Sequence, residues 1–119
     1  MDPYISFNKA LKEFIKCSIE RFPHVKELKM MLMSYKMLKT LSKKRPCKLF
    51  KSITHDCQDS IMNKDESYFL QYGCDSSSIA DTFNATIHKE WDQMTDDDKN
   101  AIWQHLQVLV LLSHKCQTI

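Results

Sequence analysis

The chain has 119 residues and a formal net charge of +2, with 17 Lys and Arg against 15 Asp and Glu. It contains one glycine and three prolines, which is too few for the many tight turns of a strand-rich fold. A hydrophobic content of 43% with 27% charged residues is typical of a globular protein and argues against disorder. We therefore expect one all-α domain over residues 1–119, a bundle of five or six helices.

The first predicted helix follows Asp2-Pro3, because Asp caps a helix and Pro suits its first turn. Apolar residues then recur at helical spacing as far as Pro23. A second helix is predicted from about residue 24 to 43, and it carries two apolar stripes. The first stripe is Leu28, Leu32, Tyr35 and Leu38; the second is Met30, Met33, Met37 and Leu41. We expect both stripes in the core, because half-apolar helices in small domains usually lie between two neighbours.

Pro46 is expected to open a third helix, with Phe50, Ile53, Cys57 and Ile61 on one face. A short apolar turn at residues 68–72 is predicted to end at Gly73, the single glycine. A fifth helix is predicted over residues 79–94.

The last stretch, residues 95–116, is predicted to be the central core helix. Thr95 can cap it, three aspartates follow where the helix dipole favours negative charge, and its second half is apolar on nearly every side. The side chains expected to be buried are Trp103, Leu106, Leu109, Val110, Phe14, Ile53, Phe83 and Trp91.

No catalytic or metal site is expected. The five cysteines have no framework spacing, and without a signal peptide they are predicted to be reduced thiols of a protein that is not secreted. The pairs His55-Asp-Cys57 and His114-Lys-Cys116 offer four zinc ligands in principle, but their spacing is unusual and no zinc is predicted. No nucleophile elbow, phosphate loop or transmembrane span is visible, so no cofactor and no enzymatic activity are expected.

Basic and acidic side chains are distributed unevenly between the two halves of the chain. Residues 1–51 carry 13 basic and 4 acidic side chains, whereas residues 52–119 carry 4 basic and 11 acidic ones. A methionine-rich helix beside a basic rim is typical of a surface that binds a protein partner. We expect a non-enzymatic interaction protein that uses residues 24–45, with Met30, Met33, Met37, Lys36 and Lys39 as candidate contacts.

The alternative is an accessory nucleic-acid-binding protein that uses the basic cluster between Lys36 and Lys51. Its candidate phosphate contacts are Lys43, Lys44, Arg45, Lys48 and Lys51. The acidic second half would repel nucleic acid, and no base-reading motif is evident.

Several short motifs occur together: Phe22-Pro23, Lys44-Arg45-Pro46, Asp65-Glu66 and Ile102-Trp103-x-x-Leu106-Gln107-x-Leu109. With them the chain resembles a family of short uncharacterised helical proteins of large nucleocytoplasmic DNA viruses, of the mimivirus and phycodnavirus kind. The resemblance implies a viral protein of the host cytoplasm, the virus factory or the virion, with a viral or host protein as partner. Asp65-Glu66 could cap the short helix or pair with a basic residue of the second helix, and of these we expect the salt bridge.

Overall fold

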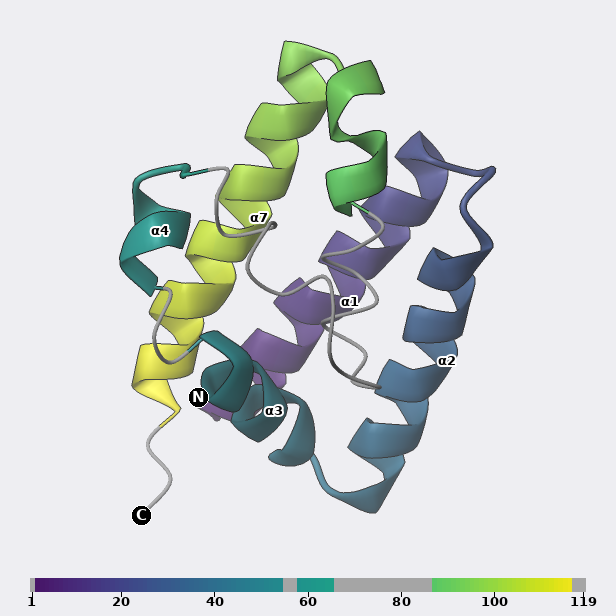
Figure 1. Ribbon diagram of the computed structural model, residues 1–119. Coiled ribbons are helices and arrows are strands. Elements are labelled where there is room, and N and C mark those ends of the chain that lie inside the picture. The colour runs from purple at the N-terminus through teal and green to yellow at the C-terminus, as the bar shows by residue number, and fades with distance from the viewer. Residues whose placement is uncertain (1, 55–57, 66–86, 117–119) are drawn as a thin grey trace.

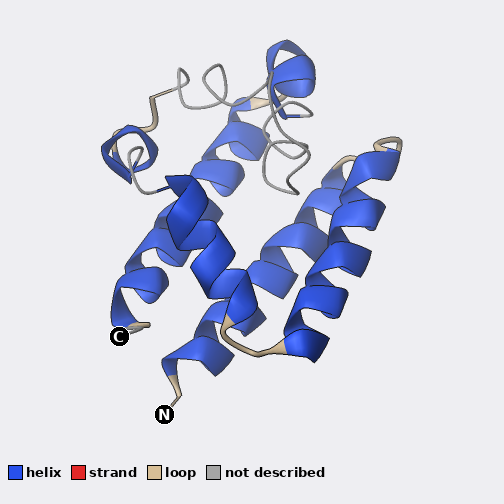
Figure 2. Cartoon of the chain, turned by 60° about the horizontal axis from the view of Figure 1, so that its bottom comes forward, coloured by secondary structure: helices blue, strands red, loops and turns tan. Residues whose placement is uncertain are grey.

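In the computed structural model, residues 2–54, 58–65 and 87–116 are described. All regular secondary structure in these ranges is helical (Figure 2), which confirms the all-α prediction. The elements are α1 (Pro3–Arg21), α2 (Lys26–Leu41), α3 (Arg45–Thr54), α4 (Gln58–Met62), the 3-10 helix η1 (Trp91–Gln93) and α7 (Asp96–Lys115). The predicted turn at residues 68–72, Gly73 and residues 79–86 of the predicted fifth helix lie outside the described residues.

The two longest helices begin where their caps predict. The Asp2 carboxylate accepts the backbone N–H of Tyr4 at 2.9 Å, and Pro3 fills the first position of α1. The Thr95 hydroxyl accepts the N–H of Asp98 at 3.1 Å, so α7 begins with its three aspartates in the first turn. Both caps satisfy backbone donors that a helix start leaves free.

Helix α1 lies at the centre of the bundle, with α7 on one side and α2 on the other (Figure 1). It also packs against α3. α7, the helix expected at the centre, packs against α1, α3 and α4, so α1 and α7 share the central position. The apolar circumference of α7 is only partly covered: Val108 is 47% and Leu111 is 55% exposed, because the neighbours of α7 leave one side of it open.

α1 is held at both ends by ion pairs. Asp2 pairs with Lys43 at the turn between α2 and α3, and Arg21 pairs with Asp98 at the start of α7. The positions of these two pairs show that α1 runs antiparallel to both α2 and α7. Exposed ion pairs of this kind add little stability. The orientation of α1 therefore depends mainly on the apolar contacts between these helices.

The shorter helices α3 and α4 pack against the long ones. The Phe50 ring of α3 packs on Phe7 of α1, with ring centroids 5.4 Å apart. The Gln107 side-chain amide donates to the carbonyls of Ile61 and Met62, which ties α4 to α7. The predicted third helix is thus represented by two described helices, α3 and α4, with residues 55–57 between them left undescribed.

Of the eight side chains that the sequence predicts to be buried, the six that the structure describes are buried. Buried residues of the expected set are Phe14, Trp91, Trp103, Leu106, Leu109 and Val110. The two tryptophans meet edge to face with centroids 5.8 Å apart. The side chain of Ile53 and all of Phe83 lie outside the described residues.

Candidate partner-binding surface on α2

The outer face of α2 carries four large apolar side chains that point into solvent. Met30, Met33, Met37 and Leu41 are each 65–69% exposed, and they are called the Met strip below. The expectation that this stripe lies in the core was wrong. α2 buries one stripe, Leu28, Met31 and Tyr35, against the bundle, and the Met strip lies on the opposite side.

Helical geometry aligns the Met strip along the axis. Its members follow one another at intervals of three, four and four residues, which keeps them on one side of a helix with about 3.6 residues per turn. Contiguous exposed apolar surface of this kind is uncommon on a monomeric protein and marks interaction sites.

Exposed lysines flank the strip on one side. Lys29 is four residues before Met33 and Lys36 is three residues after it, so both adjoin Met33 on the helix surface. Lys39 is also exposed, but it lies about 120° around the helix from Met33. The structure therefore unites Met30, Met33, Met37 and Lys36 of the expected contacts and separates Lys39 from them.

Sequence reasoning did not name two residues of this surface as contacts, although it placed Leu41 on the same stripe as the methionines. Leu41 continues the spacing of the three methionines, and Lys29 precedes Met33 by one helical turn. The sequence shows that both residues lie on or beside this face of the helix. They can be identified as candidate contacts only once that face is known to be exposed.

The opposite side of α2 is fixed against the bundle. Leu28 and Tyr35 are almost completely buried, and the Tyr35 hydroxyl donates to the backbone carbonyl of Asn8 on α1. Burial raises the pKa of Tyr35, so its hydroxyl keeps its proton and stays a donor. A surface strip on a helix fixed in this way is presented without a large ordering cost on binding.

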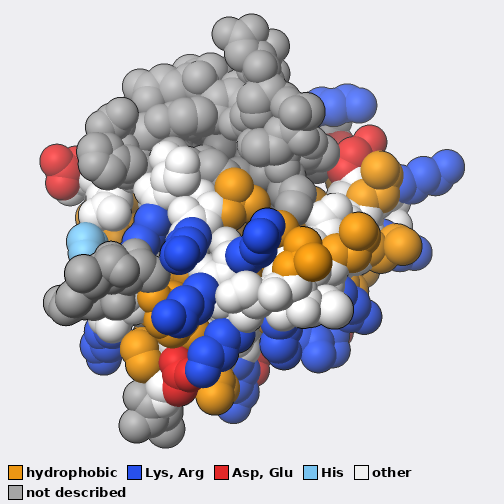
Figure 3. Space-filling view, turned by 90° about the horizontal axis from the view of Figure 1, so that it is seen from below, with side chains coloured by type: hydrophobic (Ala, Val, Ile, Leu, Met, Phe, Trp, Pro, Cys, Tyr) orange, Lys and Arg blue, Asp and Glu red, His pale blue; other side chains and the backbone are white. Residues whose placement is uncertain are grey.

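The candidate phosphate contacts of the alternative function cluster near the lower end of the molecule. Lys and Arg side chains gather on the face seen from below, with hydrophobic side chains among them (Figure 3). Three of the five are engaged within the fold. Lys43 pairs with Asp2, Lys44 lies 5.7 Å from the centroid of the Tyr4 ring, and Lys51 donates to the carbonyl of Cys116.

The remaining two, Arg45 and Lys48, are exposed, and their side chains make no hydrogen bond, ion pair or ring contact within the described part of the chain. The Lys43 ammonium holds the pKa of the Asp2 carboxyl below its usual range, mainly through their hydrogen bond. Lys43 already has a carboxylate partner within the fold, so fewer cationic side chains are free to bind phosphate than the sequence suggests.

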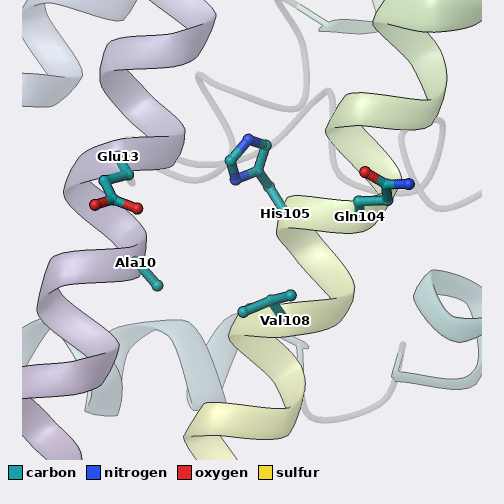
Figure 4. Close-up of a pocket in the computed structure, with 5 residues that line it drawn as sticks. All are labelled: Ala10, Glu13, Gln104, His105 and Val108. Atoms are coloured by element: carbon teal, nitrogen blue, oxygen red, sulfur yellow. The ribbon is translucent and has the colours of Figure 1, made fainter.

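An open pocket of about 280 Å³ lies between α1 and α7, lined by Ala10, Glu13, Gln104, His105 and Val108. Figure 4 shows the His105 ring between the two helices. The ring stacks on Phe14, with centroids 5.2 Å apart, and burial lowers the His105 pKa. A neutral imidazole and a carboxylate thus share this pocket, but the described residues that line it include no hydroxyl or thiol nucleophile for them to activate.

The described residues contain no group of three or more His, Cys, Asp or Glu side chains placed to hold a metal ion. His55 and Cys57 of the predicted pairs lie outside the described ranges, as does Glu66; Asp65 is exposed. Among the described helices, none has the length and apolar character that crossing a bilayer requires.

The α2 surface thus combines an apolar strip with a basic edge on a fixed helix. Comparisons with family models, with curated proteins and with solved structures find no match to this chain. The resemblance to proteins of large DNA viruses stays a prediction from the short motifs, and function is inferred below from the surface itself.

Proposed function

We propose that the chain is a non-enzymatic interaction protein that binds a protein partner through the outer face of α2. The observation that carries the proposal is the exposure of the Met strip, with each of its four side chains about two-thirds open to solvent. In the viral setting implied by the sequence motifs, the partner would be a viral or a host protein.

The chemistry of the strip favours an apolar groove or helix as its target. Removing apolar side chains from water is the main driving force of association, at about 25 cal/mol per Å². Unbranched methionines adapt to irregular partner surfaces. A row of apolar anchors at three- and four-residue steps matches the mode in which a helix lies in a groove.

The lysines beside the Met strip would orient a bound partner. Lys29 and Lys36 are exposed beside Met33, so a partner with carboxylates along one side of its apolar groove would be attracted and held in one direction. Such rim charges mainly affect the association rate and its salt dependence. The expected partner therefore has an apolar groove with one acidic edge.

Nucleic-acid binding is kept as the second candidate because Arg45 and Lys48 are exposed without a partner in the described structure. It is less favoured because Lys43, Lys44 and Lys51 have partners within the fold. The two functions differ in salt response, since phosphate contacts weaken steeply with salt whereas apolar contacts do not.

The test places a photo-crosslinking amino acid at position 33 or position 37 of the full chain, in cells that produce it. A matched control places it at Gln104, an exposed position on α7. Covalent products are separated under denaturing conditions, with and without nuclease treatment, and identified by mass spectrometry.

A protein adduct that forms at positions 33 and 37 but not at 104, and that fades when Lys29 and Lys36 are replaced by Glu, supports the proposal. An adduct of two copies of the chain would identify the partner as the chain itself. Products that contain nucleic acid instead would favour the second candidate. Equal labelling from all three positions would exclude α2 as the binding surface.

A further inference from the structure

Two cysteines far apart in the sequence meet in the interior of the bundle. Cys47 lies in the first turn of α3, and Cys116 is the residue that ends α7. Both are completely buried and belong to the same core cluster. The Cys116 thiol is one of the groups that shift the pKa of Cys47, which is expected only of side chains that lie near each other.

Lys51 holds these two segments together. It lies four residues after Cys47, so the two side chains share one face of α3. Its ammonium donates to the backbone carbonyl of Cys116, one of the carbonyls that a helix end leaves without an internal partner. The end of α7 is thus fixed against the side of α3 that carries Cys47.

The surroundings keep the Cys47 thiol unreactive while it stays buried. Burial, together with the neighbouring Cys116 thiol, raises the pKa of Cys47 to about 12, although the Lys51 charge acts in the opposite direction. The thiolate is the reactive form of cysteine, so reaction requires the last turn of α7 to open. Helix ends open at a small cost in free energy compared with a helix centre.

We propose that Cys47 and Cys116 form an intramolecular disulfide when the protein meets a disulfide oxidant such as oxidised glutathione. The proposal does not depend on partner binding through α2. It assigns the pair as an oxidation site that joins the end of α7 to the start of α3.

The reaction proceeds by two exchanges. In the opened state the Cys116 thiolate attacks one sulfur of glutathione disulfide, forms a mixed disulfide and releases one glutathione thiolate. The Cys47 thiolate then attacks the Cys116 sulfur and releases the second glutathione thiolate. The two cysteine thiols lose two protons and two electrons in total, and one glutathione disulfide becomes two glutathione molecules.

The disulfide would restrict the unfolded chain more than the folded one. It closes a loop of about 70 residues, and long loops gain the most from such a link. For a chain of this size, the expected rise in melting temperature is on the order of 10 °C.

The experiment equilibrates the reduced full chain in glutathione buffers that run from reducing to oxidising. Free thiols are then blocked with N-ethylmaleimide in denaturant, and the products are analysed by intact mass and peptide mapping. Melting curves are recorded for the same samples. Cys47→Ala and Cys116→Ala test the pair, and Cys17→Ala, at a half-buried position on α1, is the matched control.

The proposal expects the number of blocked thiols to fall from five to three, with Cys47 linked to Cys116 in the peptide map. Wild type and Cys17→Ala should both gain melting temperature on oxidation, whereas the other two variants should not. A link between other cysteines, a lasting glutathione adduct on Cys47 or Cys116, or five free thiols in the oxidising buffer would overturn it. The wild-type map decides the question even if a variant fails to fold.

Discussion

The Tyr35 hydroxyl on α2 donates a hydrogen bond to the backbone carbonyl of Asn8 on α1 at 3.0 Å. The Asn8 side-chain amide in turn donates to the carbonyl of Lys43 at 2.9 Å. These two bonds fix the distance between α1, α2 and the turn that follows α2. The exposed Met strip is therefore carried by a helix whose position is set from its buried side.

Tyr35→Phe removes the hydroxyl and keeps the ring, so it isolates the contribution of this hydrogen bond. We expect the free energy of unfolding to fall by about 1 kcal/mol, the usual net value of one intramolecular hydrogen bond. Urea denaturation followed by circular dichroism measures the change. Thr40→Ala, on the exposed side of the same helix, is the control and should not destabilise the chain.

Met31 and Met33 give a matched comparison of the two faces of α2. Met31 is 8% exposed and Met33 is 67% exposed. Met31→Ala should lower the free energy of unfolding by about 2–5 kcal/mol because it leaves a cavity, whereas Met33→Ala should change it by less than about 0.5 kcal/mol. Equal losses in denaturation curves of the two variants would mean that the Met strip is packed against protein.

Trp103→Ala tests the contact between α7 and the segment before it. The indole is buried and meets Trp91 edge to face, so the variant should lose about 3–5 kcal/mol of stability. Thermal melting measures this loss. A variant that melts like the wild type would contradict the assignment of Trp103 to the core.

His105 should make stability depend on pH below neutrality. Burial lowers its pKa below the usual 6.5; Arg21 lowers it further, and Glu13 acts in the opposite direction. The unfolded chain then binds more protons than the folded one as the pH falls below about 6.5, so stability is lost on acidification.

His105→Gln removes this titration. Denaturation at pH 7.5 and pH 5.5 should therefore show a smaller loss in the variant than in the wild type, whatever the absolute stability of the variant. The carboxyl groups of Asp2 and Asp98 titrate at lower pH, since both have pKa values below the usual 3.8. A larger acid loss in the variant would show that the folded protein favours the protonated ring.

Local sequence signals predicted the helix starts well, because a cap depends on neighbours in the chain. Asp2 and Thr95 were identified from the sequence and cap α1 and α7 as expected. The central position of α1 was not predicted. It depends on which helices pack on which faces, and hydrophobic spacing carries no such information.

The same limit explains the error at the Met strip. Spacing predicted two apolar stripes on α2 correctly but could not say that only one of them has a neighbour. Lys43, Lys44 and Lys51 appeared equivalent in the sequence, yet each is engaged by a different distant group: Asp2, the Tyr4 ring and the Cys116 carbonyl. The meeting of Cys47 with Cys116 likewise required three-dimensional contacts.

The central position of α1 also bears on the order in which the chain assembles. Pairing α1 with α2 closes a short loop, whereas pairing α1 with α7 joins segments from opposite ends of the described chain and costs more chain entropy. We expect the α1–α2 hairpin to form before α7 docks. Leu28→Ala should then mainly slow folding and Ile102→Val should mainly speed unfolding, and stopped-flow kinetics with the reverse pattern would place α7 in the nucleus.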